Sequence, residues 1–393
     1  MATAPLQGIT VVSIEQAVAG PFATRQLADL GARVIKIERP DGGDFARGYD
    51  AAVKGLASWF VWLNRTKESV TLDLKRPEAG AILDRLLHGA DVFVQNLAPG
   101  AADRLGLSAA ALRARYPRLV VCNISGYGTS GPYAGRKAYD LIIQSEVGML
   151  SITGTDDTPS KVGVSIADIS AGMYAYSGIL TALLTRKDTG EGAVLDVALI
   201  DTLGEWMSYA AYYTEYGGTP PSRTGASHAT IAPYGPLRTC DGAIVVAVHN
   251  NREWTEFCAH VLQQPGLASD PRFETNGLRV QHREALVAAI EAVLTRLPSA
   301  EVRGRLEAAH IANANVNSMR EYLQHPQLTG RDCWREIESP AGPVRALVPP
   351  VRIDGVEPVM GAVPALGQHT KAVLEELAFD RETITRWAES GVI

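Results

Sequence analysis

Residues 8–40, "GITVVSIEQAVAGPFATRQLADLGARVIKIERP", contain two apolar runs separated by a segment with helical spacing. The runs at 8–15 and 33–40 are rich in β-branched residues and predict buried strands. The segment between them, 20–32, predicts a helix that ends near Gly31. Two strands joined by a crossover helix form a βαβ unit of the Rossmann type, so this stretch predicts a parallel sheet.

The same alternation continues towards the C-terminus. Strands alternating with helices of about a dozen residues indicate a parallel sheet with helices on both faces. We therefore predict an α/β fold whose large domain holds a Rossmann-like parallel sheet. Further strands are expected at 69–75, 90–96, 118–125 and 192–199, and helices at 77–88, 108–116, from Asp168 onward, and at 200–213.

Changes of composition predict the domain organisation. The stretch "EYGGTPPSRTGASHA" is rich in Gly, Pro and Ser, which is typical of a linker. Amphipathic helices and the strand-like "GAIVVAVHN" beyond it predict a smaller α+β domain. The predicted boundaries are 1–213 for the large domain, 214–226 for a linker, 227–323 for the small domain, 324–343 for a second linker and 344–393 for a return to the large domain.

The overall composition excludes several classes of function. The 393 residues carry a net charge of −6, so no basic field attracts nucleic acid. Four scattered cysteines predict neither a disulfide framework nor a zinc site, and they fit a reducing cytoplasm. We expect no bound metal and no signal peptide. We also expect no membrane span, because the longest nearly uncharged run, 169–185, falls short of about 20 apolar residues.

A dinucleotide site is the first candidate among the motifs. "GYGTSG" at 126–131 follows a predicted strand, but Pro132 and another glycine follow it where a helix should begin. Glu38 ends the second strand, where a ribose ligand would lie, yet the preceding turn lacks the glycine pattern. The sequence therefore disfavours a nicotinamide cofactor.

Four basic residues lie just beyond the ends of predicted strands: Arg39, Lys75, Arg104 and Lys137. Ligands of open α/β sheets bind along the carboxyl edge of the sheet. Any one of these cations alone is typical of a solvated surface. Four of them at the same topological place indicate a site for a ligand with several phosphates.

Asp168 stands before a long run of apolar and small residues. Asp is a preferred N-cap, so the residue is interpreted as the cap of the following helix. It is also a candidate nucleophile, because a carboxylate at a helix N-terminus is favoured and should stay ionised. Tyr139 is interpreted as a packing residue whose hydroxyl is its polar tip, and Asp140 as the cap of another helix. An isolated histidine such as His228 is most often structural.

Five stretches together resemble a known family, the class III CoA-transferases of the CaiB/BaiF group. They are "PLQGITVVSIEQAVAGPFATRQLADLGARVIKIERPDGGDFAR", "NRTKESVTLDLKRPE", "ADVFVQNLAPGAADRLGL", "PRLVVCNISGYGTSGPYAGRKAYDLIIQ" and "VSIADISAGMYA". The resemblance implies that Asp168 is catalytic and that two ring-shaped chains interlock as a homodimer. It places CoA contacts on Val18, Ala19, Arg39, Leu72 to Lys75, Asn96, Leu97, Ala98, Arg104, Lys137, Ala138 and Tyr139.

Several departures from the family refine this expectation. Some members carry Gln where this chain has Val18, and the glycine run of the formyl-CoA branch is replaced by "RTGASHATIAPYG". The family also contains 2-methylacyl-CoA racemases, which use a His in a Gly-His-Asp sequence. Here the matching residues are Ala138, Tyr139 and Asp140, and Tyr is a poor base at neutral pH. The racemase stays an alternative, as does a non-catalytic acyl-CoA-binding protein.

The resemblance implies a reaction without a permanently bound cofactor, in which coenzyme A and its thioesters are substrates. CoA passes from an acyl-CoA to a free carboxylic acid through mixed anhydride and aspartyl-CoA thioester intermediates on Asp168. Backbone N–H groups near the start of its helix are expected to stabilise the oxyanions. Arg47, Asp140 and His228, with Arg223 nearby, are the candidates for substrate contact. Since Arg suits bidentate carboxylate recognition, small dicarboxylates such as succinate, malate, mesaconate or itaconate are expected; alternatively, Arg47 binds a CoA phosphate or faces solvent.

Overall fold

The computed structural model describes residues 4–393, which divide into two compact units. The first unit comprises residues 4–147, 162–208 and 328–393. The second comprises residues 148–161 and 209–327. The chain thus leaves the first unit twice, and the C-terminal segment returns to it. The domain boundaries given above remain a prediction.

The first unit is built on a six-stranded sheet of order β3-β2-β1-β4-β5-β6, in which every neighbouring pair is parallel. This confirms the predicted α/β fold with a Rossmann-like parallel sheet. The order reverses between β1 and β4, and a crevice opens at such a switch point. The strands are β1 (Thr10–Ile14), β2 (Arg33–Glu38), β3 (Lys67–Thr71), β4 (Val92–Gln95), β5 (Val120–Ser125) and β6 (Val194–Ala198).

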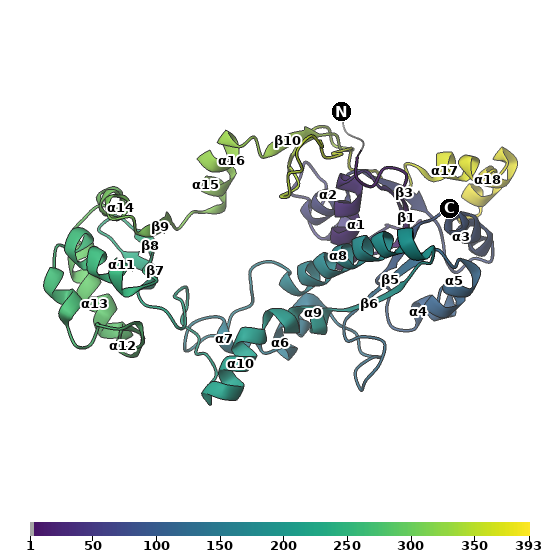
Figure 1. The fold of residues 1–393 in the computed structure, drawn as a ribbon. Helices are drawn as coiled ribbons and strands as arrows, with labels where there is room; N and C mark the ends of the chain where they lie inside the picture. Colours follow the sequence, from purple (N-terminus) through teal and green to yellow (C-terminus); the bar gives the residue numbers. More distant parts are fainter. Residues whose placement is uncertain (1–3) are drawn as a thin grey trace. The chain divides into compact units, whose positions relative to one another are not determined.

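Helices cover both faces of this sheet (Figure 1). Alternate strand residues such as Val12, Ile35 and Phe93 face one layer, where they form a buried apolar cluster with the helices of that side. These helices are α3 (Glu78–His88), α5 (Ala109–Arg115), α17 (Thr370–Glu376) and α18 (Arg381–Glu389). The opposite layer contains α1 (Ala19–Asp29) and α8 (Ile166–Thr189), which cross in contact.

Shorter elements complete the first unit. The 3₁₀ helix η1 (Phe45–Gly48) and helix α2 (Ser58–Asn64) follow β2, and the hairpin of β10 (Trp334–Ile337) and β11 (Val344–Leu347) packs against them. Helices α4 (Ala101–Arg104) and α6 (Asp140–Glu146) follow β4 and β5. The single helix expected at 200–213 is wrong: α9 (Leu199–Trp206) is followed by its C-cap Met207, whose ψ is 0°, and then by α10 (Ser208–Gly217), which belongs to the second unit from Tyr209 onward.

The second unit has its own sheet and core, of the α+β kind. Its three-stranded antiparallel sheet consists of β7 (Tyr234–Arg238), β8 (Ala243–Ala247) and β9 (Ala312–Asn315). The buried aromatic residues Trp254 and Phe257 lie at the centre of its core. Its helices include α7 (Met149–Ile152), α11 (Asn251–Glu256), α12 (Asn276–Gln281), α13 (Arg283–Leu294), α14 (Ser299–Ala308) and α15 (Met319–Leu323). The following helix, α16 (Pro326–Gly330), contains the boundary at which the chain returns to the first unit.

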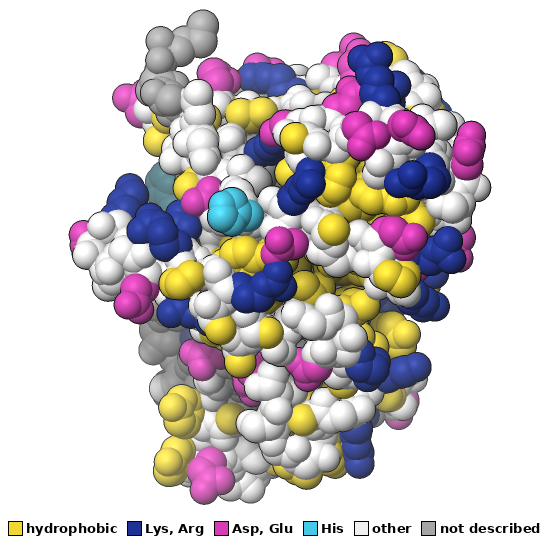
Figure 2. Space-filling model, turned by 90° about the vertical axis from the view of Figure 1, so that its right-hand side faces the viewer, with side chains coloured by type: hydrophobic (Ala, Val, Ile, Leu, Met, Phe, Trp, Pro, Cys, Tyr) yellow, Lys and Arg dark blue, Asp and Glu magenta, His cyan; other side chains and the backbone are white. Residues whose placement is uncertain are grey.

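Charged side chains of both signs share the surface. On the face drawn in Figure 2, basic and acidic side chains are interspersed, with apolar side chains between them. This distribution agrees with a small net charge of −6. Within residues 4–393, no helix combines the length and apolar character that a bilayer crossing requires.

Candidate active site

One amide side chain links the two central strands at the switch point of the sheet. Asn96, directly after β4, accepts a hydrogen bond from the Gln16 N–H and donates one to the Gln16 carbonyl, both at 2.8 Å. Gln16 belongs to the turn after β1, so Asn96 joins the carboxyl ends of the two central strands. The turn that carries Val18 and Ala19 is thereby fixed at the crevice, beside the segment Asn96–Ala98.

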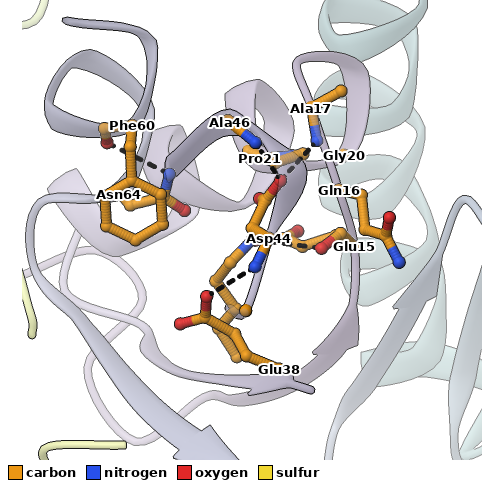
Figure 3. Close-up of polar contacts among 12 residues, drawn as sticks. Glu15, Gln16, Ala17, Gly20, Pro21, Glu38, Asp44, Ala46, Phe60 and Asn64 are labelled. Atoms are coloured by element: carbon orange, nitrogen blue, oxygen red, sulfur yellow. Dashed lines mark hydrogen bonds and ion pairs between the residues drawn. The ribbon is translucent and has the colours of Figure 1, made fainter. Parts of the chain in front are cut away.

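That turn has a strained backbone. Ala17 has φ 60°, in the left-handed region that residues with a Cβ rarely adopt. Its N–H donates to Asp44 Oδ1 at 2.9 Å, and the same oxygen accepts from the N–H of Ala46 in the first turn of η1 (Figure 3). The Asp44 carboxylate therefore links the first turn to η1, and this contact offsets the strain.

A buried ionic network lies behind Asp44. Lys36 is 0% exposed; its Nζ contacts Asp44 at 2.7 Å and Glu15 at 3.6 Å. Lys67 Nζ lies 2.7 Å from Glu15, and burial lowers the pKa of Lys67 to about 8. Lone buried charges are costly, so these groups compensate one another. Sequence reasoning missed the network; the only signal was a Lys in the middle of the buried run "RVIKIE".

The buried Glu38 and the half-buried Arg47 form a second ion pair. Arg47 donates to both carboxylate oxygens of Glu38 at 2.8 Å and stacks on the Phe60 ring at 3.7 Å. Although burial opposes the charged form, the hydrogen bonds from Arg47 and the charge of Lys36 lower the pKa of Glu38 to about 2. A substrate carboxylate would have to compete with Glu38 for Arg47, whose role in substrate contact remains a prediction.

Helix α8 meets α1 at Gly172. A Cβ on Gly172 would lie 2.8 Å from the carbonyl oxygen of Ala19 and 2.9 Å from Phe22 Cδ1, so only glycine permits this approach. Asp168 precedes Gly172 by four residues, which places both on the same face of the helix. The crossing therefore presents Asp168 on the side of α8 that faces the start of α1.

The structure corrects the expected role of Asp168 as a cap. Helix α8 begins at Ile166, its N-cap is Ser165, and Asp168 is the third helical residue. The Ser165 side chain makes no capping hydrogen bond. The interpretation of Asp168 as the N-cap is therefore wrong, because the helix starts three residues earlier than an Asp168 cap requires.

The cap comes instead from Asp140, the first residue of α6. Its Oδ1 accepts from the backbone N–H of Ala167 at 2.8 Å and of Asp168 at 3.4 Å. Its Oδ2 accepts from Gln144 at 2.7 Å. Asp140 is thus a cap, as expected, but of another helix. The same contacts occupy two of the backbone donors that the sequence suggested for oxyanion stabilisation.

The surroundings of Asp168 favour its neutral form. Its side chain is half-buried, and this burial, followed by the nearby negative charge of Asp140, raises its pKa to about 7. Tyr49, after η1, has a raised pKa because of burial and the charges of Asp44 and Asp168. The expectation that Asp168 is held fully ionised is wrong. Around neutral pH, its carboxyl is poised between the two forms.

The four predicted cations differ in their distance from the strands: Arg39 directly follows β2 and Lys75 lies shortly after β3, whereas Arg104 ends α4 and Lys137 lies just before α6. Arg39 donates to the Gly43 carbonyl and lies 4.8 Å from the centre of the Phe45 ring. Lys75, Arg104 and Lys137 are exposed, and within the described part of the chain none of the three makes a salt bridge. Their charges are available to an anionic ligand.

The remaining predicted CoA contacts differ in exposure. Val18, Ala19 and Leu72 are buried. Leu97 is half-buried and Ala98 is exposed. Ala138 packs against Gly126, where a Cβ would lie 2.1 Å from the Ala138 Cβ, which explains the first glycine of "GYGTSG". Tyr139 is the N-cap of α6 and is 71% exposed.

His228 belongs to the second unit. Its ring stacks on Tyr234 with centroids 5.1 Å apart, and Arg283 donates to its carbonyl at 2.7 Å. Arg223 donates to the carbonyls of Thr155 and Asp156 of the same unit. The part of His228 in substrate contact remains a prediction. Within residues 4–393, no group of three or more His, Cys, Asp and Glu side chains is arranged to hold a metal ion.

Comparison with known proteins defines the class. The model of CoA-transferase family III matches residues 6–370. The chain is 35% identical to succinate–glutarate CoA-transferase of Agrobacterium fabrum, over 98% of this chain and 97% of that protein. It is 33% identical to succinyl-CoA:glutarate CoA-transferase of Mus musculus, over 99% of this chain and 90% of that protein.

A solved structure agrees. The crystal structure of a CaiB/BaiF family protein from Brucella suis superposes with a TM-score of 0.84 at 34% identity, over 96% of this chain and 100% of that one. The chain belongs to CoA-transferase family III. It is an enzyme of that class, and the resemblance found in the sequence is confirmed.

Proposed function

We propose that this enzyme moves CoA from an acyl-CoA to a free carboxylic acid and that Asp168 is the nucleophile. The observation that carries the proposal is the position of Asp168: a half-buried carboxyl on the face of α8 that meets α1, the helix that follows the turn at the switch point of the sheet. Substrates of open α/β sheets bind there. A carboxylate in a recessed site is a suitable covalent nucleophile.

The reaction proceeds by exchange of acyl bonds. The Asp168 carboxylate attacks the thioester carbonyl; the C–S bond breaks, CoA thiolate leaves, and a mixed anhydride forms. The thiolate attacks the aspartyl carbonyl, which releases the donor acid as a carboxylate and leaves an aspartyl-CoA thioester. The acceptor carboxylate then displaces the thiolate to form a second anhydride. Attack of the thiolate on the acceptor carbonyl gives the new thioester and regenerates Asp168.

The other residues of the proposed site bind CoA and keep it in place during the reaction. Lys75, Arg104 and Lys137 are exposed and make no salt bridge within residues 4–393, which suits the phosphates of CoA. Binding CoA there makes the return of its thiolate effectively unimolecular. Because water would hydrolyse the anhydrides and the aspartyl thioester, the reaction requires a site from which water is excluded.

We propose small dicarboxylic acids of four or five carbons as substrates. The supporting observation is that the two enzymes compared above are named for succinate or succinyl-CoA and for glutarate. On this chain, Arg47 and His228 are the candidates for the second carboxylate. We also propose a cytoplasmic homodimer of interlocked chains, which size-exclusion chromatography with light scattering tests by its mass.

The decisive experiment incubates the protein with succinyl-CoA and a panel of acids that includes glutarate, malate, mesaconate and itaconate. Mass spectrometry follows the new thioesters, and heavy water in a parallel reaction reports exchange at the α-carbon. Asp168→Ala should abolish thioester exchange, while Asp188→Ala, an exposed Asp near the far end of the same helix, should not. No new thioester with wild type across varied donors would refute transfer, and deuterium uptake would favour the racemase.

A further inference from the structure

We propose that Asp140 is a positioning residue for Asp168: its carboxylate holds the first turn of α8 in place and does not bind the substrate. This inference rests on the proposed role of Asp168 as nucleophile. It replaces the sequence-based assignment of Asp140 to substrate contact.

The first oxygen supplies the cap that α8 itself lacks. Ser165 is at the N-cap position but makes no side-chain cap hydrogen bond. Asp140 Oδ1 lies 2.8 Å from the nitrogen of Ala167 and 3.4 Å from that of Asp168. The first N–H groups of a helix need such an acceptor. A residue from α6 therefore determines where the turn that carries Asp168 lies.

The second oxygen belongs to a chain of two hydrogen bonds. Asp140 Oδ2 accepts from Gln144 Nε2 at 2.7 Å, and Gln144 Oε1 accepts from the Val162 N–H at 3.0 Å. Gln144 is 0% exposed. Asp140 and Gln144, one turn apart on α6, thus hold both the start of α8 and the segment that leads into it.

Both oxygens of Asp140 are therefore engaged by the protein. A substrate could reach this carboxylate only by breaking contacts that hold α8. The charge of Asp140 also acts on Asp168, since it contributes to the raised pKa of that carboxyl. The titratable groups that face Asp168 are Asp140 from α6 and Tyr49 after η1. One side chain thus positions the nucleophile and limits its ionisation.

Two variants separate positioning from substrate contact. Asp140→Ala removes both contacts. The double change Asp140→Asn with Gln144→Glu preserves them: the new amide oxygen accepts from α8, its NH₂ donates to the new carboxylate at position 144, and that carboxylate accepts from Val162. Asp188→Ala, at the other end of α8, is the matched control.

Hydrogen–deuterium exchange measures the helix start independently of catalysis. In a peptide covering the first turns of α8, Asp140→Ala should raise exchange at least tenfold, while the double variant and the control should resemble wild type. Unchanged protection in a folded Asp140→Ala protein would overturn the inference. Wild type without transferase activity would refute the proposed function but leave this exchange result to be judged on its own.

Kinetics provide the second readout. Asp140→Ala should lower kcat at least tenfold with less than a threefold change in the KM for either substrate, and the double variant should recover most of kcat. In the double variant the acid limb of the pH profile should also shift, because the charge near Asp168 has moved. A loss expressed mainly in KM for the acid substrate, not rescued by the double variant, would instead indicate substrate contact and overturn the inference.

Discussion

The carboxylate of Asp140 accepts a hydrogen bond from the backbone N–H of Asp168 at 3.4 Å, so two carboxyl groups share the start of one helix. Their proximity contributes to the raised pKa of Asp168, together with burial, which is the larger cause. The helix start therefore does not keep Asp168 fully ionised, contrary to what its first-turn position suggests. The consequences can be measured as activity against pH and as stability.

The rate of thioester exchange should fall as the pH drops through about 7. Only the ionised carboxylate is a nucleophile, and the pKa of Asp168 is raised to about 7. One unit below that pKa, kcat/KM should be about tenfold under its plateau. Initial rates between pH 5 and pH 9, with Asp168→Ala as the blank at each pH, test this. A rate that stays level down to pH 5 would contradict it.

Replacing the charged carboxyl should stabilise the fold. Because the pKa of Asp168 is higher in the folded state than its ordinary value of 3.8, wild-type stability decreases as the pH rises from about 4 to about 7 and then stays level. Asp168→Asn lacks this loss, so it should gain up to about 4 kcal/mol above pH 7. Urea unfolding at pH 8 and at pH 4 provides the measurement, and the gain should largely vanish at pH 4.

The crossing of α1 and α8 should tolerate no side chain at Gly172. The Cβ of Gly172→Ala would meet the Ala19 carbonyl oxygen at 2.8 Å, which forces the helices apart and should cost about 1–3 kcal/mol. Because the displaced turn holds Val18 and Ala19, kcat should fall as well.

Gly178→Ala is the matched control on the same helix. Its Cβ would meet only Leu195 Cδ1, at an ordinary contact distance of 3.5 Å. Alanine has the higher helix propensity, by about 1 kcal/mol, so this variant should be as stable as wild type or more so. Equal losses in the two variants, measured by thermal and urea unfolding, would mean that the crossing is not the cause.

Removing Glu15 should strongly destabilise the first unit. Glu15→Ala leaves Lys67 buried without its carboxylate at 2.7 Å and weakens the compensation of Lys36, which should cost about 3–5 kcal/mol. Glu301→Ala, which breaks the exposed pair with Arg305, should cost far less.

A double variant separates the two causes of that loss. In Glu15→Met with Lys67→Met, the buried charge is removed together with its partner, so much of the stability should return. Denaturant unfolding of the single and double variants gives the coupling energy. If the double variant is as unstable as the sum of its single changes, the ion pair does not account for the effect.

The periodic features of the sequence predicted most of the sheet. β-branched runs and crossover helices yielded all six parallel strands within a few residues, because strand and helix patterns depend on neighbours along the chain. The helix expected at 200–213 instead breaks at Met207; the one glycine of that stretch, Gly204, lies inside α9 and does not mark the break. The short helix α2 and the strand β7 also had no clear periodicity.

Candidate residues of the site could be named from the sequence, and their roles remain predictions. Asp168 was named as a possible nucleophile, with the catalytic role implied by the family resemblance, and the cations were named from the rule that ligands bind at the carboxyl edge of a parallel sheet. The partners of these residues were not readable. Asp140 and Ala167, Gln16 and Asn96, and Glu15 and Lys67 are each joined across dozens of residues.

The sequence by itself thus determined the α/β class, the family and the residue types at the carboxyl edge of the sheet. Only the tertiary structure decided that Asp140 caps α8, that Arg47 is paired with Glu38, and that the pKa of Asp168 is raised to about 7. The physical reason is that capping, ion pairing and burial depend on distances between elements, and folding brings together groups that local pattern cannot relate.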